Sequence, residues 1–280
     1  MLNFRNIGYL DVTRYAKKLD NNYYISFYNP VYLLIWKDFY KTNIYFHDDE
    51  VYFKIYLEDL GFSYFSPFNK KIDFFINEGK NNAKDEGIEF NIGPVTLDEL
   101  YNYQSKKIDF IENKIYNSYL YNPEDFANLS KKYLKSLKNY ERFNKNNYFK
   151  FIEREDINNI LLFLSDKINQ KDKKYFPLLN MLKCAFEHLY ELKIEGYMLI
   201  DENNHIKSFL LSSFNNKVVF IHTCFYETFD DFLALISFYA KKVRNVVTYM
   251  NIEEESINYI LENDGIIKPK IEKFYAKYNL

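Results

Sequence analysis

Several residue types are scarce in this 280-residue chain, which has 7 Gly, 6 Pro, 2 Cys and 1 Trp. No apolar run approaches the roughly 18 residues that a membrane-spanning helix needs. The first twenty residues, MLNFRNIGYLDVTRYAKKLD, carry charges throughout and lack the apolar core of a secretory signal. Neither sign of charge dominates, since 37 basic residues stand against 39 acidic ones. These absences predict a cytoplasmic protein without the chain-wide basic field of a dedicated nucleic-acid binder.

The two cysteines, Cys184 and Cys224, fall in segments that read as a buried helix and a strand. There is no CxxC motif, and the four histidines are scattered without zinc-ligand or Ser-His-Asp spacing. We therefore expect reduced core cysteines and no metal site. His222 lies two residues before Cys224, so alternation along a strand predicts that these two side chains share a face.

Aromatic residues are abundant, at 20% of the chain with 28 Tyr and 27 Phe. They could form stacking platforms for bases or sugars. However, they are spread along the whole chain, and the parallel excess of Lys, Asn and Ile is typical of A/T-rich codons. The composition therefore favours aromatics that replace Leu and Val in the core.

The first half of the chain predicts helices followed by a meander. Amphipathic spacing indicates helices over residues 11–19 and 26–40. The segment NIYFHDDEVYFKIYLEDLGFSYFSPF contains three apolar and aromatic runs separated by HDDE and EDLG, which predicts three antiparallel strands. A helix is expected over residues 71–84, and Thr96 with Glu99 three residues later forms a capping-box pattern at the start of another.

The second half repeats this order more fully. It predicts two helices, strands in EGYMLIDENNHIKSFLLSSF and KVVFIHTCF, a helix, a strand in NVVTYMNI, a helix and a last strand in IEKFYAKYNL. This repetition predicts an α/β (α+β) fold of two related lobes, residues 1–148 and 149–280, with mixed, mostly antiparallel sheets flanked by helices.

Four segments together resemble the family named after the C-terminal domain of phosphatidylglycerol lysyltransferases, and they span nearly the whole chain. They are SFYNPVYLLIWKDFY, YLYNPEDFANLSKKYLKSLKNYERFNKN, EGYMLIDENNHIKSFLLSSF and MNIEEESINYILENDGIIKP. The resemblance implies two GNAT-like (acyl-CoA N-acyltransferase-like) lobes. It also implies a relationship to aminoacyl-tRNA-dependent transferases, in which an activated ester meets an acceptor amine or hydroxyl in a cleft between the lobes.

The chain departs from the family pattern near its end. The family motif reads Asn-Arg-Glu, whereas Ile252 stands here between Asn251 and Glu253. Asn251 and Glu253 share a face of the predicted strand, so they could orient an acceptor amine or act as a general base. The alternative is a strand end followed by acids that cap the next helix.

A basic segment is the second candidate site. Its cationic residues recur at spacings of three and four on a predicted helix and would suit the phosphates of tRNA, a nucleotide or a lipid head group. The alternative is a solvated helix face. The residues predicted to bind substrate are Lys132, Lys135, Lys138 and Arg142.

The turn CFYETFDDF occupies the place where a GNAT-like lobe binds the pyrophosphate of acetyl-CoA. It has no glycine and carries two aspartates at the helix start, which repel phosphate. We therefore expect no cofactor. The sequence suggests a transferase of an activated acyl or aminoacyl group, dependent on aminoacyl-tRNA rather than acetyl-CoA. A catalytically degenerate binding or structural protein on the same fold is the alternative.

Overall fold

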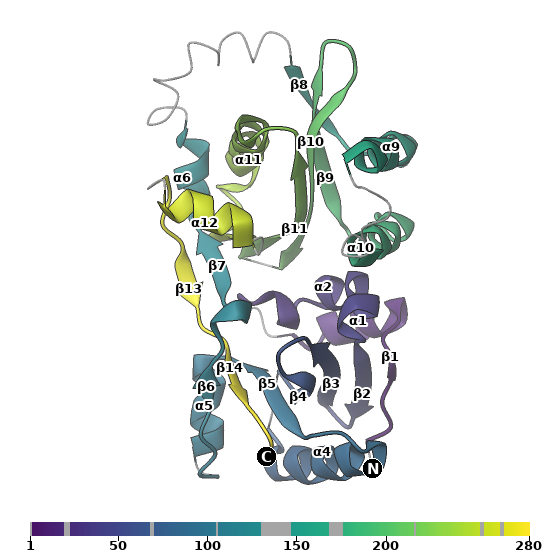
Figure 1. The fold of residues 1–280 in the computed structure, drawn as a ribbon, viewed down its shortest axis with the longest axis vertical. Helices are drawn as coiled ribbons and strands as arrows, with labels where there is room; N and C mark the ends of the chain where they lie inside the picture. The colour runs from purple at the N-terminus through teal and green to yellow at the C-terminus, as the bar shows by residue number, and fades with distance from the viewer. Residues whose placement is uncertain are drawn as a thin grey trace. The chain divides into compact units, whose positions relative to one another are not determined.

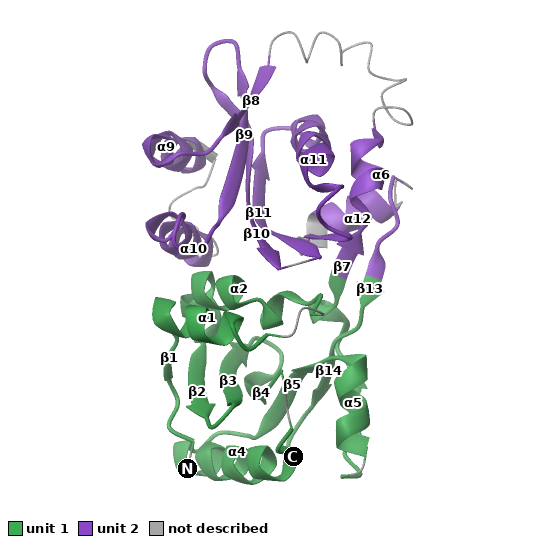
Figure 2. Cartoon of the chain, turned by 180° about the vertical axis from the view of Figure 1, so that it is seen from behind, with its two compact units in different colours: residues 1–118, 271–280 green, residues 119–270 purple. Residues whose placement is uncertain are grey.

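The computed structural model describes residues 2–19, 23–67, 70–104, 106–129, 147–167, 176–215, 217–252, 255–263 and 266–280. The chain divides into two units (Figure 2), the first from residues 1–118 and 271–280 and the second from residues 119–270. Each has a seven-stranded mixed sheet flanked by helices. The predicted fold class, an α/β (α+β) fold with two mixed, mostly antiparallel sheets flanked by helices, is confirmed.

The first unit has the strand order β1-β2-β3-β4-β5-β14-β6. Its elements are β1 (Arg5–Asn6), α1 (Tyr9–Ala16), η1 (Ser26–Tyr28), α2 (Pro30–Ile35), α3 (Lys37–Tyr40), β2 (Asn43–His47), β3 (Glu50–Leu57), β4 (Gly61–Phe65), α4 (Ile72–Glu86), β5 (Asn91–Val95), α5 (Leu97–Gln104), β6 (Ile111–Glu112), η2 (Lys114–Tyr116) and β14 (Tyr275–Lys277).

The predicted meander of the first unit is confirmed, since β2, β3 and β4 pair antiparallel in sequence. Side chains alternate between the two faces of the sheet along β3. Phe53 points to one face, where its ring contacts Tyr15 of α1. The neighbouring Tyr52 points to the other face and stacks on Phe75 of α4. Helices α1 and α4 therefore cover opposite faces of this sheet (Figure 1).

The helix predicted over residues 26–40 is instead three short pieces, η1, α2 and α3. Asn29 ends the first piece and begins the second, because its side chain accepts hydrogen bonds from the Val31 and Tyr32 amides. Pro30 takes the first helical position, where its missing N–H costs nothing. Trp36 separates α2 from α3. The apolar spacing thus identified the helical segment but not its interruptions.

The second sheet has the strand order β13-β7-β12-β11-β10-β9-β8, and its outer strand β13 begins at the last residue of the second unit and ends in the first. The described elements from β7 to β13 are β7 (Ser118–Tyr121), α6 (Pro123–Ala127), β8 (Asn147–Phe151), η4 (Arg154–Asp156), α9 (Ile157–Lys167), α10 (Phe176–Glu187), β9 (Glu195–Asp201), β10 (Ile206–Asn215), β11 (Val218–Tyr226), α11 (Phe229–Val243), β12 (Tyr249–Ile252), α12 (Glu255–Asn263) and β13 (Lys270–Glu272).

Two layers of helices flank the second sheet, with α9 and α10 drawn on one side and α11 on the other (Figure 1). Aliphatic side chains of β11 and β12, among them Val219 and Met250, form one core cluster with Phe232 and Ile236 of α11. Strands β8 to β11 are antiparallel, whereas β11 and β12 are parallel and are joined through α11. Among the described residues, no helix is both long and apolar enough to cross a bilayer.

The units divide elsewhere than between residues 148 and 149. Strand β7 pairs with β12 of the second sheet, and α6 packs against α11. At the other end, the last strand, expected in the second lobe, pairs with β5 and β6 of the first sheet. Strand alternation alone could not have placed either strand, because pairing depends on partners distant in the sequence.

Candidate functional site

Asn251 is the predicted site residue that the structure describes. It lies on β12 between Phe220 of β11 and Leu120 of β7, and it is completely buried. Its predicted partner Glu253 lies outside the described residues, as do all four residues of the basic segment, Lys132, Lys135, Lys138 and Arg142. Their roles stay predictions.

Asn251 lies one residue before the end of the described pairing between the parallel strands β11 and β12. The last described pair is Ile221 with Ile252, and β11 itself extends to Tyr226. In α/β sheets, ligands bind beyond the carboxyl ends of parallel strands where the strand direction changes. The end of this pair is therefore the natural candidate site of the second unit, and it is where the sequence predicted Asn251 and Glu253.

A β-bulge on β11 changes the direction of His222. Leu211 pairs with Thr223 and Ser212 with Ile221, which leaves His222 as the extra residue between them. Its Nε2 lies 2.8 Å from the Ser213 hydroxyl, on the same face of the sheet as Asn251. Burial lowers the pKa of His222 to about 3, so the imidazole is neutral at physiological pH.

The prediction that His222 and Cys224 share a face is wrong. Cys224 belongs to the cluster that packs on α11, together with Leu210, its partner on β10. His222 instead contacts Ser213 on the opposite face. The bulge inserts one residue between the two side chains and so breaks the alternation on which the prediction rested.

The turn before α11 is closed by a capping box. The Thr228 hydroxyl accepts from the Asp231 amide, and the Asp231 carboxylate accepts from the Thr228 amide and hydroxyl. Burial raises the pKa of Asp231, partly offset by the hydrogen bonds from Thr228. Side chains thus occupy amides that a phosphate would need, and acidic groups surround them.

The first unit contains a buried carboxyl group that the sequence identified as a helix cap. The predicted capping box is confirmed, since the Thr96 amide and hydroxyl both lie 2.9 Å from Glu99 Oε2. Tyr28 also donates to this oxygen. Burial raises the pKa of Glu99 to about 7, although the hydrogen bonds from Thr96 and Tyr28 oppose the shift.

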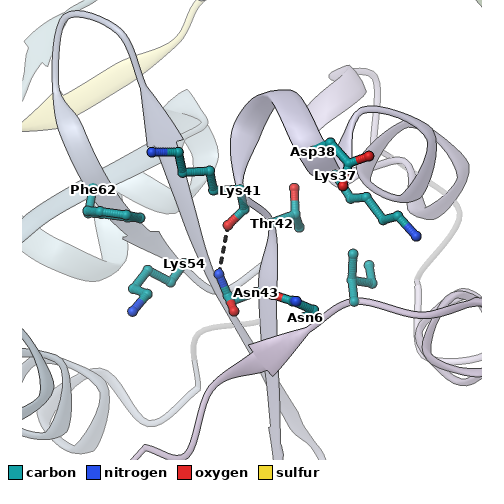
Figure 3. Close-up of a pocket in the computed structure, with 9 residues that line it drawn as sticks. Asn6, Lys37, Asp38, Lys41, Thr42, Asn43, Lys54 and Phe62 are labelled. Carbon is teal, nitrogen blue, oxygen red and sulfur yellow. Dashed lines mark hydrogen bonds between the residues drawn. The ribbon is translucent and has the colours of Figure 1, made fainter. Parts of the chain in front are cut away.

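A hollow with several lysines lies elsewhere in the first unit (Figure 3). Its base includes Asn6, Asn43 and Lys54, which are paired in register on β1, β2 and β3 and therefore share a face. Lys54 is buried and donates to both oxygens of Glu86, at 2.6 and 2.7 Å. The remaining lining residues come mostly from α3 and its turn: Ile7, Lys37, Asp38, Lys41, Thr42 and Phe62.

Sequence reasoning missed this hollow. The available signal was Lys54, a lone charge within the apolar strand VYFKIYL. A buried lysine in such a strand needs an acidic partner, and Glu86 lies 32 residues further along. Lys37 and Lys41 have the i, i+4 spacing that is also common on solvated helices, so spacing alone could not identify them.

No protein-family model matches the chain, and no curated protein matches it in sequence. Several solved structures, however, are similar to the chain in fold. A conserved protein of unknown function from Bacteroides thetaiotaomicron is 19% identical, with 99% of this chain and 100% of that chain covered and a TM-score of 0.82. L-PGS from Bacillus licheniformis is 14% identical, with 96% and 91% covered and a TM-score of 0.65.

A third similar structure is the C-terminal domain of a protein from Agrobacterium fabrum assigned as a lysylphosphatidylglycerol synthetase. It is 10% identical, with 98% of this chain and 93% of that chain covered and a TM-score of 0.59. At these identities the comparisons show a shared fold. They confirm, at the level of the fold, the resemblance to the C-terminal domain of phosphatidylglycerol lysyltransferases.

Proposed function

We propose that this protein transfers an activated acyl or aminoacyl group to an amine or hydroxyl acceptor, with aminoacyl-tRNA rather than acetyl-CoA as the donor. The observation that carries the proposal is the position of the buried Asn251 next to the last described pair of the parallel strands β11 and β12, within a fold shared over nearly the full chain with L-PGS. The capping box at α11 disfavours acetyl-CoA, because its carboxylate stands where a pyrophosphate would bind.

The proposed chemistry is an attack by the acceptor on the ester carbonyl of the donor. A new amide or ester bond forms, the bond to the tRNA ribose oxygen breaks, and that oxygen leaves as a hydroxyl after receiving the proton that the acceptor gave up. In our proposal Glu253 takes the acceptor's proton, and Asn251, which is buried, positions the strand end rather than touching the substrate. The basic segment would hold the tRNA phosphates.

Transfer of labelled amino acid from a mixed aminoacyl-tRNA pool to lipid vesicles or to small amines tests this proposal. We expect transfer that falls at least about a hundredfold in Glu253→Gln, the loss typical of a missing general base. Transfer from acetyl-CoA instead of aminoacyl-tRNA would contradict the donor assignment. A complete absence of transfer would favour the second candidate below.

The double variant Lys135→Ala/Lys138→Ala tests the tRNA contact. If these lysines neutralise phosphates, the slope of log affinity against log salt becomes shallower by about one to two. Lys80→Ala/Lys84→Ala is the matched control, since both lysines are exposed on α4. An equal effect of both double variants would mean that the basic segment is a solvated helix face and does not bind the tRNA phosphates.

A catalytically degenerate binding protein is the second candidate. Its specific support is the side chain at position 251, which is fully buried, together with Ile252 where the family has Arg. This candidate predicts tRNA or phosphate binding without transfer, so the two experiments above distinguish the candidates.

A further inference from the structure

The lysine-lined hollow of the first unit has the size and chemistry of a small-molecule site. Its volume is about 500 Å³, within the range of about 300 to 1,000 Å³ found for ligand pockets. Its residues come from β1 to β4 and from α3 with its turn, all in the first unit. It shares no residue with the candidate site at the end of β11 and β12.

Lys54 supplies a cation whose position is fixed. Its side chain is only 7% exposed, and its ammonium group lies 5.6 Å from the ring centre of Phe4 and 5.3 Å from that of Phe62. Two of its three N–H groups donate to Glu86. Among the described residues, no acceptor other than Glu86 takes a hydrogen bond from this ammonium group, so its third N–H remains able to donate to a ligand oxygen.

Lys41 lies near the same aromatic ring. Its ammonium group is 5.9 Å from the ring centre of Phe62 and 4.8 Å from that of Tyr56. In Figure 3, Lys41 and Lys54 appear on either side of Phe62, and Lys37 extends from α3 on the other side of the hollow. Two ammonium groups and an aromatic face are thus brought together around one ring.

The charge balance of the hollow favours an anion. The pair of Lys54 with Glu86 is neutral overall, which leaves Lys37 and Lys41 against the single carboxylate of Asp38. Neither Lys37 nor Lys41 forms an ion pair with a carboxylate among the described residues. An anion here would meet ammonium groups that do not have to break an existing ion pair.

We propose that this hollow binds a small phosphate monoester. A phosphate group offers several acceptor oxygens, which suits the ammonium groups of Lys41 and Lys54 beside the Phe62 ring, with Lys37 on the far side of the hollow as a further cation, whereas a carboxylate offers only two. The Phe62 ring gives the esterified part of the ligand an apolar face. The amides of Asn6 and Asn43 border the same space and supply further polar contacts.

The protein's one tryptophan provides a local probe. Trp36 immediately precedes Lys37, so its fluorescence reports on the α3 side of the hollow. The titrants are inorganic phosphate, ribose 5-phosphate and adenosine 5′-monophosphate, the last followed by calorimetry because it absorbs light. Sodium chloride at equal ionic strength is the reference. Lys37→Gln/Lys41→Gln is the test variant, and the exposed pair Lys80→Gln/Lys84→Gln is the matched control.

We expect saturable binding of both esters, weakened at least about tenfold in Lys37→Gln/Lys41→Gln and unchanged in the control, since two charge-assisted contacts are lost. Tighter binding of the adenosine ester than of ribose 5-phosphate would support a role for the Phe62 face. The proposal is overturned if no phosphate compound saturates, or if both double variants weaken binding equally. Thermal unfolding of each variant checks that it is folded, and Lys41→Glu provides a second test if the double variant is not.

Discussion

The two units build similar sheets but bury different chemistry beside their parallel strand pairs. In the first, β4 and β5 are parallel, and the carboxyl of Glu99 and the ion pair of Lys54 with Glu86 lie nearby. In the second, β11 and β12 are parallel, and the buried groups include the neutral His222 beside Ser213 and the Asp231 carboxyl that caps α11. A shared order of elements therefore does not fix the polar groups that it encloses.

This difference predicts opposite responses to pH. Glu99 has a raised pKa, so its contribution to stability is present below the ordinary value of 4.5 and is lost as pH rises through about 7. His222 has a lowered pKa, so its contribution is present above the ordinary value of 6.5 and is lost as pH falls toward about 3. The titration of Glu99 should therefore make the first unit more stable in mild acid, whereas the titration of His222 should make the second unit less stable.

The largest expected effect is that of His222. Below pH 6.5 the unfolded chain takes up a proton that the folded unit excludes, which lowers the free energy of unfolding by up to about 5 kcal/mol at pH 3. His222→Gln should remove this part of the acid dependence. Urea unfolding followed by circular dichroism at several pH values measures it, with the exposed His205→Gln as the control. Equal pH slopes in both variants would refute the assignment.

The titration of Glu99 should have the opposite pH dependence, so that the free energy of unfolding falls as the pH rises. Between pH 4.5 and 7 the unfolded chain releases a proton that the folded unit retains, so the free energy of unfolding falls by up to about 3 kcal/mol. Trp36 fluorescence follows the first unit during urea unfolding. Glu99→Gln should be insensitive to pH over this interval, whereas Glu89→Gln, changed at an exposed position, should behave like the unaltered protein. A stability that rises with pH in the unaltered protein but not in Glu99→Gln would show that the carboxyl is ionised in the fold.

Removing one partner of the ion pair between Lys54 and Glu86 should cost more stability than removing the other. Glu86→Gln leaves the buried Lys54 ammonium without its carboxylate, and we expect a loss of about 2 kcal/mol, below the value for a fully buried pair because Glu86 is 39% exposed. Lys54→Met retains the packing of the stem and leaves a carboxylate that reaches water, so its cost should be about half as large. Urea unfolding followed by Trp36 fluorescence measures the free energy of unfolding of both variants. A greater loss in Lys54→Met would mean that packing, not charge, dominates.

Periodicity in the sequence predicted most of this architecture, and the reasons for the exceptions are physical. The helix predicted over residues 71–84 corresponds to α4, because its apolar residues face the sheet that the helix covers. The position of β14 could not be predicted, since it pairs with β5 from the far end of the chain. The direction of His222 depended on a bulge, which leaves no mark on apolar alternation.

The candidate sites likewise depend on contacts between residues that are distant in the sequence. Asn251 was correctly placed on a strand, but its complete burial depends on β7 and β11 at its sides. The lysine hollow requires β1, β2 and β3 to be in register, which no local pattern reveals. By contrast, the capping box of Thr96 and Glu99 is local, and the sequence predicted it correctly.

The smallest expected effect concerns the helices that connect the two parallel pairs. Thr228 caps α11 through a capping box, whereas Lys71 at the same point of α4 makes no side-chain cap. Thr228→Ala should therefore lower the free energy of unfolding by about 1 kcal/mol, while Lys71→Ala, which removes only an exposed ion pair with Asp48, should change it by less than about 0.5 kcal/mol. Urea unfolding followed by circular dichroism compares the two. Because Asp231 accepts from both the Thr228 amide and its hydroxyl, Thr228→Ser retains these contacts and should restore most of the loss. If Thr228→Ser were as unstable as Thr228→Ala, the threonine methyl group rather than the cap would stabilise the start of α11.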